Sequence, residues 1–256
     1  MVGSPAKACA LVVACATLAC STRHERLDDV QQVIRAERIS QLFERSAAGT
    51  LELVLAYEPA VDSARLVNLI RTHFSGDSLL HNTAVFLHAE ASLPLFTELH
   101  AWFLSDSIRR TENKAWSALR RETSEHFEAR IQQNPLDATI VRLANQLEQA
   151  SQSGFIFNSY LAAEQEARFR VIEGAQTALA RPGPWSAEQH AAGLQQIVDL
   201  KRLEALQMVE ALSEVETWRL IRAYETPSGQ WYVREYPRAL EAAFMRAARQ
   251  VVEGLQ

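Results

Sequence analysis

The chain has 256 residues, 48% of them hydrophobic, which is enough to bury a core and excludes a disordered protein. Its formal net charge of −5 argues against nucleic acid as a partner, because a phosphate-backbone binder needs a concentrated positive field. Only 9 glycines and 8 prolines interrupt long stretches of Ala, Leu, Glu, Gln and Arg, so the composition predicts an all-α protein.

The first 19 residues have the pattern of an export signal. A positive charge at Lys7 precedes an apolar run over residues 8–19. As a helix this run spans about 18 Å, which is short of the roughly 30 Å hydrocarbon core of a bilayer. We therefore expect residues 1–19 to be a signal peptide and not a membrane span.

The site of cleavage is open to three interpretations. "TLAC", ending at Cys20, resembles the lipobox of bacterial lipoproteins, in which the cysteine receives lipid and becomes the new N-terminus. "VVAC", ending at Cys15, matches the pattern better, because Thr17 of "TLAC" replaces the usual aliphatic residue, but it leaves a very short apolar run. Ordinary cleavage after Ala19 or nearby is the third interpretation. We favour lipidation of Cys20. Ser21 in the next position resembles lipoproteins sorted to the outer membrane, so we expect a periplasmic protein anchored there by lipid.

All three cysteines, Cys9, Cys15 and Cys20, lie in this N-terminal segment. If Cys20 is the first mature residue, the folded part contains no free thiol. This excludes disulfides, thiolate nucleophiles and sulfur-ligated metals from the folded part.

The breaks along the remaining chain separate segments of helix length. Helical apolar spacing predicts helices over about 62–74, 107–133, 136–153 and 186–212, with Asp62 capping the first and Ser186 with Gln189 forming a capping box for the last. "RPGPW" at 181–185 cannot continue a helix, so we expect an N-terminal helical region over 20–180 and a C-terminal helical module over 186–256. The antiparallel helical hairpins form either one elongated bundle or two helical halves.

Two segments resemble each other at a constant offset of 122 residues. The first has Phe96, Leu99, Ala101 and Trp102, and the second has Trp218, Ile221, Ala223 and Tyr224. Each is followed by a break and a further amphipathic helix. Duplication would produce this similarity, but helix hairpins also resemble one another by pattern alone.

The stretch around "TPSG" at 226–229 predicts a tight corner between two helices. Ser213 and Glu216 form a capping box for the first helix, and Thr226 is the N-cap of the second. Pro227 stands at the first helical position, where its missing N–H costs nothing, and Gly229 lets the preceding helix approach closely.

Aromatic side chains are expected to hold this corner. We expect Tyr224, Trp218 and Trp231 to fill the angle between the two helices, because burying a tryptophan contributes more than a cap does. Pro237 is expected to kink or restart the final helix, whose inward face carries Leu240, Phe244, Val251 and Leu255.

The segment "LSEVETWRLIRAYETPSGQWYVREYPRALEAA" resembles the terminal module of a family of exported bacterial proteins, known only as domain of unknown function number twenty fifty-nine. The resemblance rests on Tyr224, Thr226, Pro227, Gly229 and the later Pro237. An earlier stretch, residues 74–116, is similar to another hairpin of longer members but lacks their Ser-Pro-x-Gly turn. The resemblance implies a helical envelope protein and implies no activity.

Histidine is the one residue type left for metal chemistry. His81 and His88 lie two helical turns apart, with Glu90 beside the second. A zinc site needs about three converging ligands, and the sequence has no HExxH motif, so no metal or cofactor is expected. A metal-dependent hydrolase using His81, His88 and Glu90 remains an alternative.

The cluster "GFIFNSY" offers a further alternative. Phe155, Phe157 and Tyr160 pack in the core by default, but they could line a groove for an acyl chain or a partner helix. The leading hypothesis is a non-catalytic envelope protein that acts by binding or assembly, with an envelope protein or lipid as its partner. A carrier or chaperone that holds an apolar ligand between helices is the second hypothesis.

Overall fold

The computed structural model describes residues 27–35, 39–57, 63–175 and 187–256. Within these ranges all regular structure is helical and there is no strand, so the predicted all-α class is confirmed. A helix at residues 27–35 precedes α2 (Ile39–Tyr57), α3 (Ser63–His73), α4 (Gly76–Glu90), α5 (Leu93–Phe103), α6 (Asp106–Arg121), α7 (Ser124–Gln133), α8 (Ala138–Ser151), α9 (Ser153–Ala175), α10 (Ala187–Ala211), α11 (Glu214–Glu225) and α12 (Pro227–Leu255).

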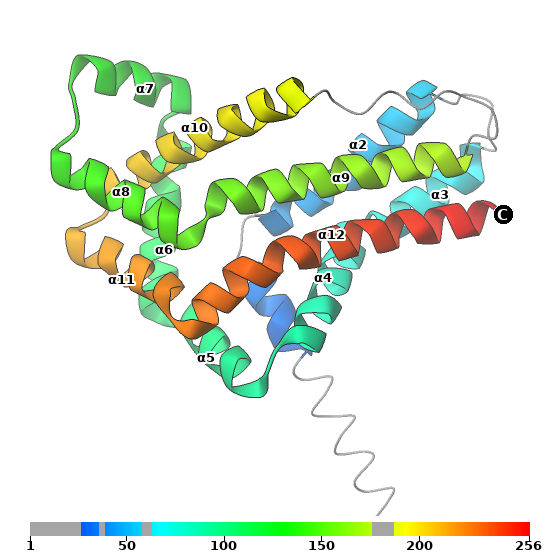
Figure 1. The fold of residues 1–256 in the computed structure, drawn as a ribbon, viewed down its shortest axis with the longest axis horizontal. Coiled ribbons are helices and arrows are strands. Elements are labelled where there is room, and N and C mark those ends of the chain that lie inside the picture. Colours follow the sequence, from blue (N-terminus) through cyan, green and yellow to red (C-terminus); the bar gives the residue numbers. More distant parts are fainter. Residues whose placement is uncertain (1–26, 36–38, 58–62, 176–186) are drawn as a thin grey trace, which may run out of the picture.

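The larger hydrophobic core, cluster 1, surrounds the long helix α12. This helix packs against α9, α4, α3 and α5, and Figure 1 shows α9 and α12 lying side by side along most of their length. Aromatic rings fill the centre, where Phe244 meets Phe43 at 6.1 Å and Tyr160 at 5.5 Å in edge-to-face contacts. Such pairs contribute about 0.5–1.5 kcal/mol beyond the area they bury.

The smaller core, cluster 2, is built from α6, α7, α8, α10 and α11 at the other end of the molecule (Figure 1). Its buried centre includes Phe127, Leu143, Val209 and Ile221. The expected domain boundary at 181–185 lies outside the described residues. Each cluster combines helices from before and after this boundary. Cluster 1 contains α4 and α12, and cluster 2 contains α6 and α11.

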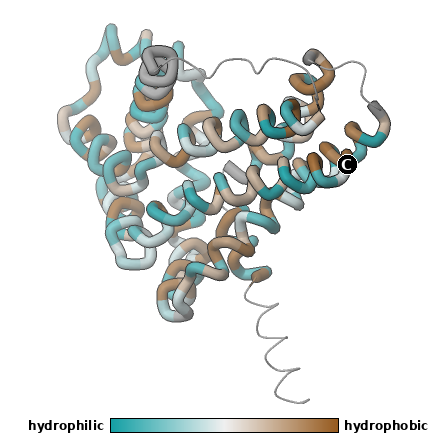
Figure 2. Tube along the Cα trace, turned by 45° about the vertical axis from the view of Figure 1, so that its right-hand side comes forward, coloured by the Kyte–Doolittle hydropathy of each residue, from teal (hydrophilic) through white to brown (hydrophobic). Residues whose placement is uncertain are grey.

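Each helix buries one stripe of its surface, and Figure 2 shows apolar and polar segments alternating along the helices. In α6, for example, Ile108 and Ala115 are buried whereas Arg109 and Arg110 are exposed. This is the pattern of amphipathic helices that bury one face in a core and leave the other exposed. Within the described ranges, no helix combines the length and the apolar character needed to cross a bilayer.

One predicted helix is wrong. The sequence predicts a continuous helix over 107–133, but the structure has α6 and α7, separated at Glu122 and Thr123. Glu122 adopts an extended conformation, with φ −140° and ψ 134°, and the Thr123 hydroxyl accepts a hydrogen bond from the backbone N–H of His126 as the N-cap of α7. The dense opposite charges of this segment are also typical of the solvated face of one continuous helix, so the sequence did not indicate the break.

The final helix does not restart at Pro237, which lies buried inside the continuous α12. The predicted inward residues Leu240, Phe244 and Val251 are fully buried. The predicted caps Asp62 and Ser186, and the signal peptide with Cys20, lie outside the described residues.

Candidate functional site

The corner between α11 and α12 has the predicted local chemistry. Ser213 and Glu216 form a reciprocal capping box at the start of α11. Thr226 Oγ1 accepts a hydrogen bond from the N–H of Gly229 at 3.0 Å, and Pro227 occupies the first turn of α12. A Cβ atom on Gly229 would lie 2.3 Å from the carbonyl oxygen of Ala223, so a larger residue would force the two helices apart.

The three aromatic residues of the corner lie in different surroundings. Trp231 is buried in cluster 1, and Tyr224 packs edge-on against Trp102 with ring centroids 5.2 Å apart. Trp218 lies farther back on α11, packs on cluster 2, and borders a shallow depression with Val215, Arg219 and Arg222 of the same helix. The corner is therefore closed by Tyr224, Trp231 and the unpredicted Trp102.

The histidines of α4 do not form a metal centre in the described part of the chain. His81 is exposed and its Nδ1 lies 3.4 Å from Nε2 of Gln31, His88 is half-buried, and Glu90 is exposed. No group of three or more His, Cys, Asp or Glu side chains there is arranged to hold a metal ion. His81, His88 and Glu90 therefore do not form the set of metal ligands that the hydrolase hypothesis requires.

A partly open cavity of about 130 Å³ lies beside the corner, lined by residues of α6, α8, α9, α10 and α11. Most of its wall is apolar and aromatic, and it includes Trp116, Leu147, Phe157, Met208, Leu220 and Tyr224. Tyr224 also lines a wider, more open groove, so this residue belongs to both hollows. An apolar cavity with a few polar groups is the usual form of a small-molecule site.

One ammonium group already lies in this cavity. Lys201 Nζ is 4.4 Å from the centroid of the Phe157 ring and 2.8 Å from Oε2 of Glu204. Its side chain is only 15% exposed, so this cation–π contact is formed largely out of water. The wall thus combines an aromatic face and a carboxylate around a cation.

The carboxylate of Glu148 has a structural role at the edge of the cavity. It accepts hydrogen bonds from the hydroxyl of Ser153 and, at 2.8 Å, from the N–H of Gly154, which caps the first turn of α9. The cap follows Gln152, which ends α8 in a left-handed conformation with φ 50°. Because both oxygens serve the helix start, we assign the Ser153–Glu148 pair to architecture and not to nucleophilic catalysis.

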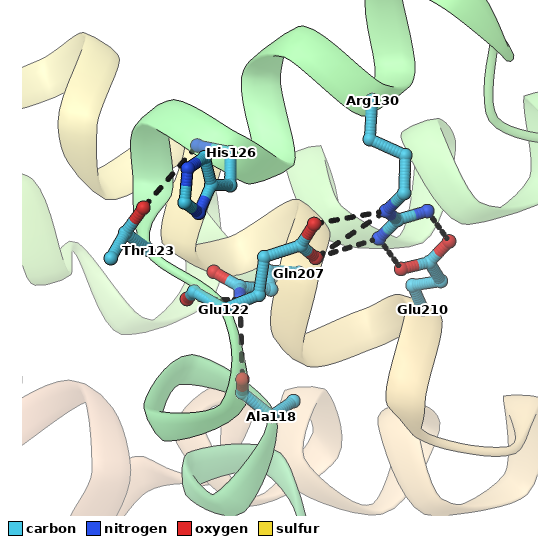
Figure 3. Close-up of polar contacts among 7 residues, drawn as sticks. All are labelled: Ala118, Glu122, Thr123, His126, Arg130, Gln207 and Glu210. Atoms are coloured by element: carbon cyan, nitrogen blue, oxygen red, sulfur yellow. Dashed lines mark hydrogen bonds and ion pairs between the residues drawn. The ribbon is translucent and has the colours of Figure 1, made fainter.

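A polar network fixes the helix that carries much of this wall (Figure 3). The buried Gln207 of α10 donates hydrogen bonds to the carbonyl oxygens of Ala118, at 3.2 Å, and Glu122, at 2.9 Å, at the end of α6. Arg130 of α7 bridges Glu210 and Glu122 with contacts of 2.6 and 3.1 Å. The hydrogen bonds that Arg130 donates to Glu210, first, and to Glu122 raise the pKa of Arg130 and keep it charged.

The "GFIFNSY" aromatics do not form one groove. Tyr160 is buried in cluster 1, where its hydroxyl lies 3.1 Å from that of Ser46 and burial raises its pKa. Phe157 lies in the cavity wall under Lys201, whereas Phe155 is 55% exposed and borders the open groove. Of the three, Phe157 alone belongs to the candidate site.

Sequence reasoning missed Glu112, Trp116, Lys201 and Glu204, which line the cavity from α6 and α10. The three-residue spacing of Lys201 and Glu204 was visible, but such pairs usually lie on solvated helix faces. Comparisons of the chain with protein-family models, curated proteins and solved structures found no match, so the resemblance to domain of unknown function number twenty fifty-nine stays a prediction.

Proposed function

We propose that this protein is exported, anchored to the outer membrane through lipid on Cys20, and acts in the periplasm by binding and not by catalysis. The leader with its lipobox-like "TLAC" supports the location. The cavity at the α11–α12 corner supports binding, because its wall joins aromatic faces to a few polar groups.

Among the binding hypotheses, this cavity favours a carrier that holds a small molecule between helices. The observation that carries the proposal is that five helices line one partly open cavity, to which Phe157, Trp116 and Tyr224 contribute aromatic side chains. The envelope protein or membrane lipid predicted as partner would then deliver or receive that molecule.

Native mass spectrometry of the full chain, purified from membranes, tests this proposal. The spectrum of the wild type should contain a bound small molecule, and Met208→Trp, which fills the cavity, should lose it. Val215→Trp is the matched control, because Val215 is 69% exposed on α11 and does not line the cavity. Equal retention by both variants, or no bound molecule in the wild type, would contradict the proposal.

A further inference from the structure

We propose that the cavity holds an uncharged, ring-sized molecule with one hydrogen-bonding group, of which phenol is the simplest example, and that Ser151 binds that group. This inference rests on the proposed binding function and adds the chemical class of the ligand. It comes from the pairing of the charges in the wall, the hydroxyl of Ser151 and the size of the cavity.

Two of the carboxylates that line the cavity are already engaged by the protein. Glu148 accepts hydrogen bonds from the hydroxyl of Ser153 and, at 2.8 Å, from the N–H of Gly154. Glu112 has an interaction of its own within the described structure. Neither carboxylate therefore needs a cation from the ligand.

The other two charges of the wall pair with each other. Lys201 Nζ lies 2.8 Å from Oε2 of Glu204, and the two side chains are only 15% and 22% exposed. The same ammonium group covers the ring of Phe157, 4.4 Å from its centroid. A charged ligand would have to break this pair, and breaking a largely buried ion pair leaves one charge without compensation. The wall therefore favours an uncharged ligand.

Ser151 supplies a polar contact that the protein itself does not use. It is the last residue of α8, it lines the cavity, and it is only 9% exposed. Among the described residues, its hydroxyl has no hydrogen-bond partner. Buried polar groups are normally hydrogen-bonded, and a hydroxyl both donates and accepts. A hydroxyl group on the ligand would satisfy Ser151 at this point of the wall.

The rest of the wall suits a ring. Leu147, Ile156, Met208 and Leu220 line the cavity, whose volume is about 130 Å³. An apolar protein cavity of about 150 Å³ holds one benzene molecule, so a single ring is of the right size. Because the cavity is partly open, this volume limits the buried part of the ligand, and a substituent can extend through the opening.

Calorimetric titration of the full chain at pH 7 with four single-ring ligands, phenol, toluene, benzylammonium and benzoate, tests charge and polarity separately. We expect phenol to bind at least as tightly as toluene, because the hydrogen bond to Ser151 offsets the loss of water from the phenol hydroxyl. The two ions should bind at least about tenfold more weakly than phenol. Binding of either ion as tight as that of phenol would overturn the uncharged class.

Ser151→Ala tests the polar contact. It should weaken phenol binding by about three- to tenfold, the effect of one hydrogen bond, and leave toluene binding unchanged. Retained toluene binding also shows that the variant is folded around an intact cavity. Ser159→Ala is the matched control, because the Ser159 hydroxyl bonds to the carbonyl oxygen of Phe155 at 2.9 Å and does not line the cavity. The assignment is wrong if Ser151→Ala changes both affinities equally, or if phenol binds far more weakly than toluene.

The failure of this inference is distinguishable from failure of the proposed function. If none of the four ligands binds but native mass spectrometry finds a bound molecule, the ligand class is wrong and the proposed function stands. If no ligand binds and no molecule is found, both fail together.

Discussion

Trp102 and Tyr224 meet edge to face, with ring centroids 5.2 Å apart and ring planes inclined by 73°. They form one of the two aromatic pairs that the 122-residue similarity matches, and Trp102 packs on both hydrophobic clusters. The helices of the two similar corners, α5–α6 and α11–α12, also pack crosswise. The first helix of each corner packs against the second helix of the other, α5 against α12 and α11 against α6. The reciprocal packing agrees with a duplication, which stays an interpretation.

This ring pair should couple the two clusters energetically. In a double-mutant cycle with Trp102→Leu and Tyr224→Leu, we expect a coupling of about 0.5–1.5 kcal/mol in the free energy of unfolding. Urea denaturation measures it. Trp102→Leu combined with Phe155→Leu is the control, because Phe155 is 55% exposed and should contribute additively. Additivity in the Trp102/Tyr224 cycle would show that the contact carries no energy of its own.

Gly229→Ala should destabilise the protein by more than about 2 kcal/mol, because its Cβ would lie 2.3 Å from the Ala223 carbonyl oxygen and 2.7 Å from Cα of Tyr224. Both are backbone atoms, so the corner must open. Gly76→Ala is the control, since the atom nearest to its Cβ would be Cγ of Glu44, at 3.3 Å. Equal midpoints in urea for the two variants would mean that the corner is not tightly packed.

Gln207→Leu should lower the free energy of unfolding by about 1–3 kcal/mol, because two partly buried carbonyl groups at the end of α6 lose their hydrogen-bond donor. The exposed Gln149→Leu on α8 should change it by less than about 0.5 kcal/mol. Hydrogen exchange should reveal faster opening of α7 in Gln207→Leu than in the wild type. Unchanged hydrogen exchange in α7 would show that Gln207 does not stabilise the break between α6 and α7.

Stability should fall in acid partly through Glu216. Hydrogen bonds from Lys114, and then from Ser213, lower the pKa of Glu216 from 4.5 to about 2 in the folded state. A carboxylate with a depressed folded pKa contributes stability above its unfolded pKa and loses it as the pH falls through the folded pKa. The contribution should therefore be complete above about pH 5 and lost by about pH 2.

Because Glu216 and Lys114 are partly exposed, with side-chain exposures of 25% and 47%, solvent screening limits the contribution to about 1 kcal/mol. Glu216→Gln should be less stable than wild type by this amount at pH 7 and equal to it near pH 2, in urea titrations at a series of pH values. Glu214→Gln is the control on the same helix. A difference that persists at pH 2 would assign the effect to helix capping alone.

The lipid anchor can be tested independently of the fold. Metabolic labelling with radioactive palmitate should label the wild type and Cys15→Ala but not Cys20→Ala, because acylation requires the thiol of the first mature residue. Equal labelling of Cys20→Ala and wild type would identify a different modified residue or none.

Much of the fold was predictable because its causes are local. Ser213 with Glu216, and Thr226 with Gly229, satisfy backbone groups within three residues, so spacing alone reveals both helix starts. The break between α6 and α7 was not predictable, because Gln207 of α10 stabilises the open end of α6 from 85 residues away.

The candidate site was missed for a related reason. Periodicity tells which face of a helix is buried, but Trp116, Phe157 and Lys201 become neighbours only through the packing of α6, α9 and α10. Nothing in the spacing of Lys201 and Glu204 distinguishes an ion pair in a cavity from one on a solvated surface.

The sequence by itself determined the helical class, the tight corner at Thr226–Gly229 and the confinement of every cysteine to the N-terminal segment, because these depend on composition and on contacts within one helical turn. Only the tertiary structure decided where α6 ends, that Pro237 lies inside a continuous helix, and which side chains share the cavity. Those features depend on which helix faces meet, and that choice is made by the summed burial of residues far apart in the chain.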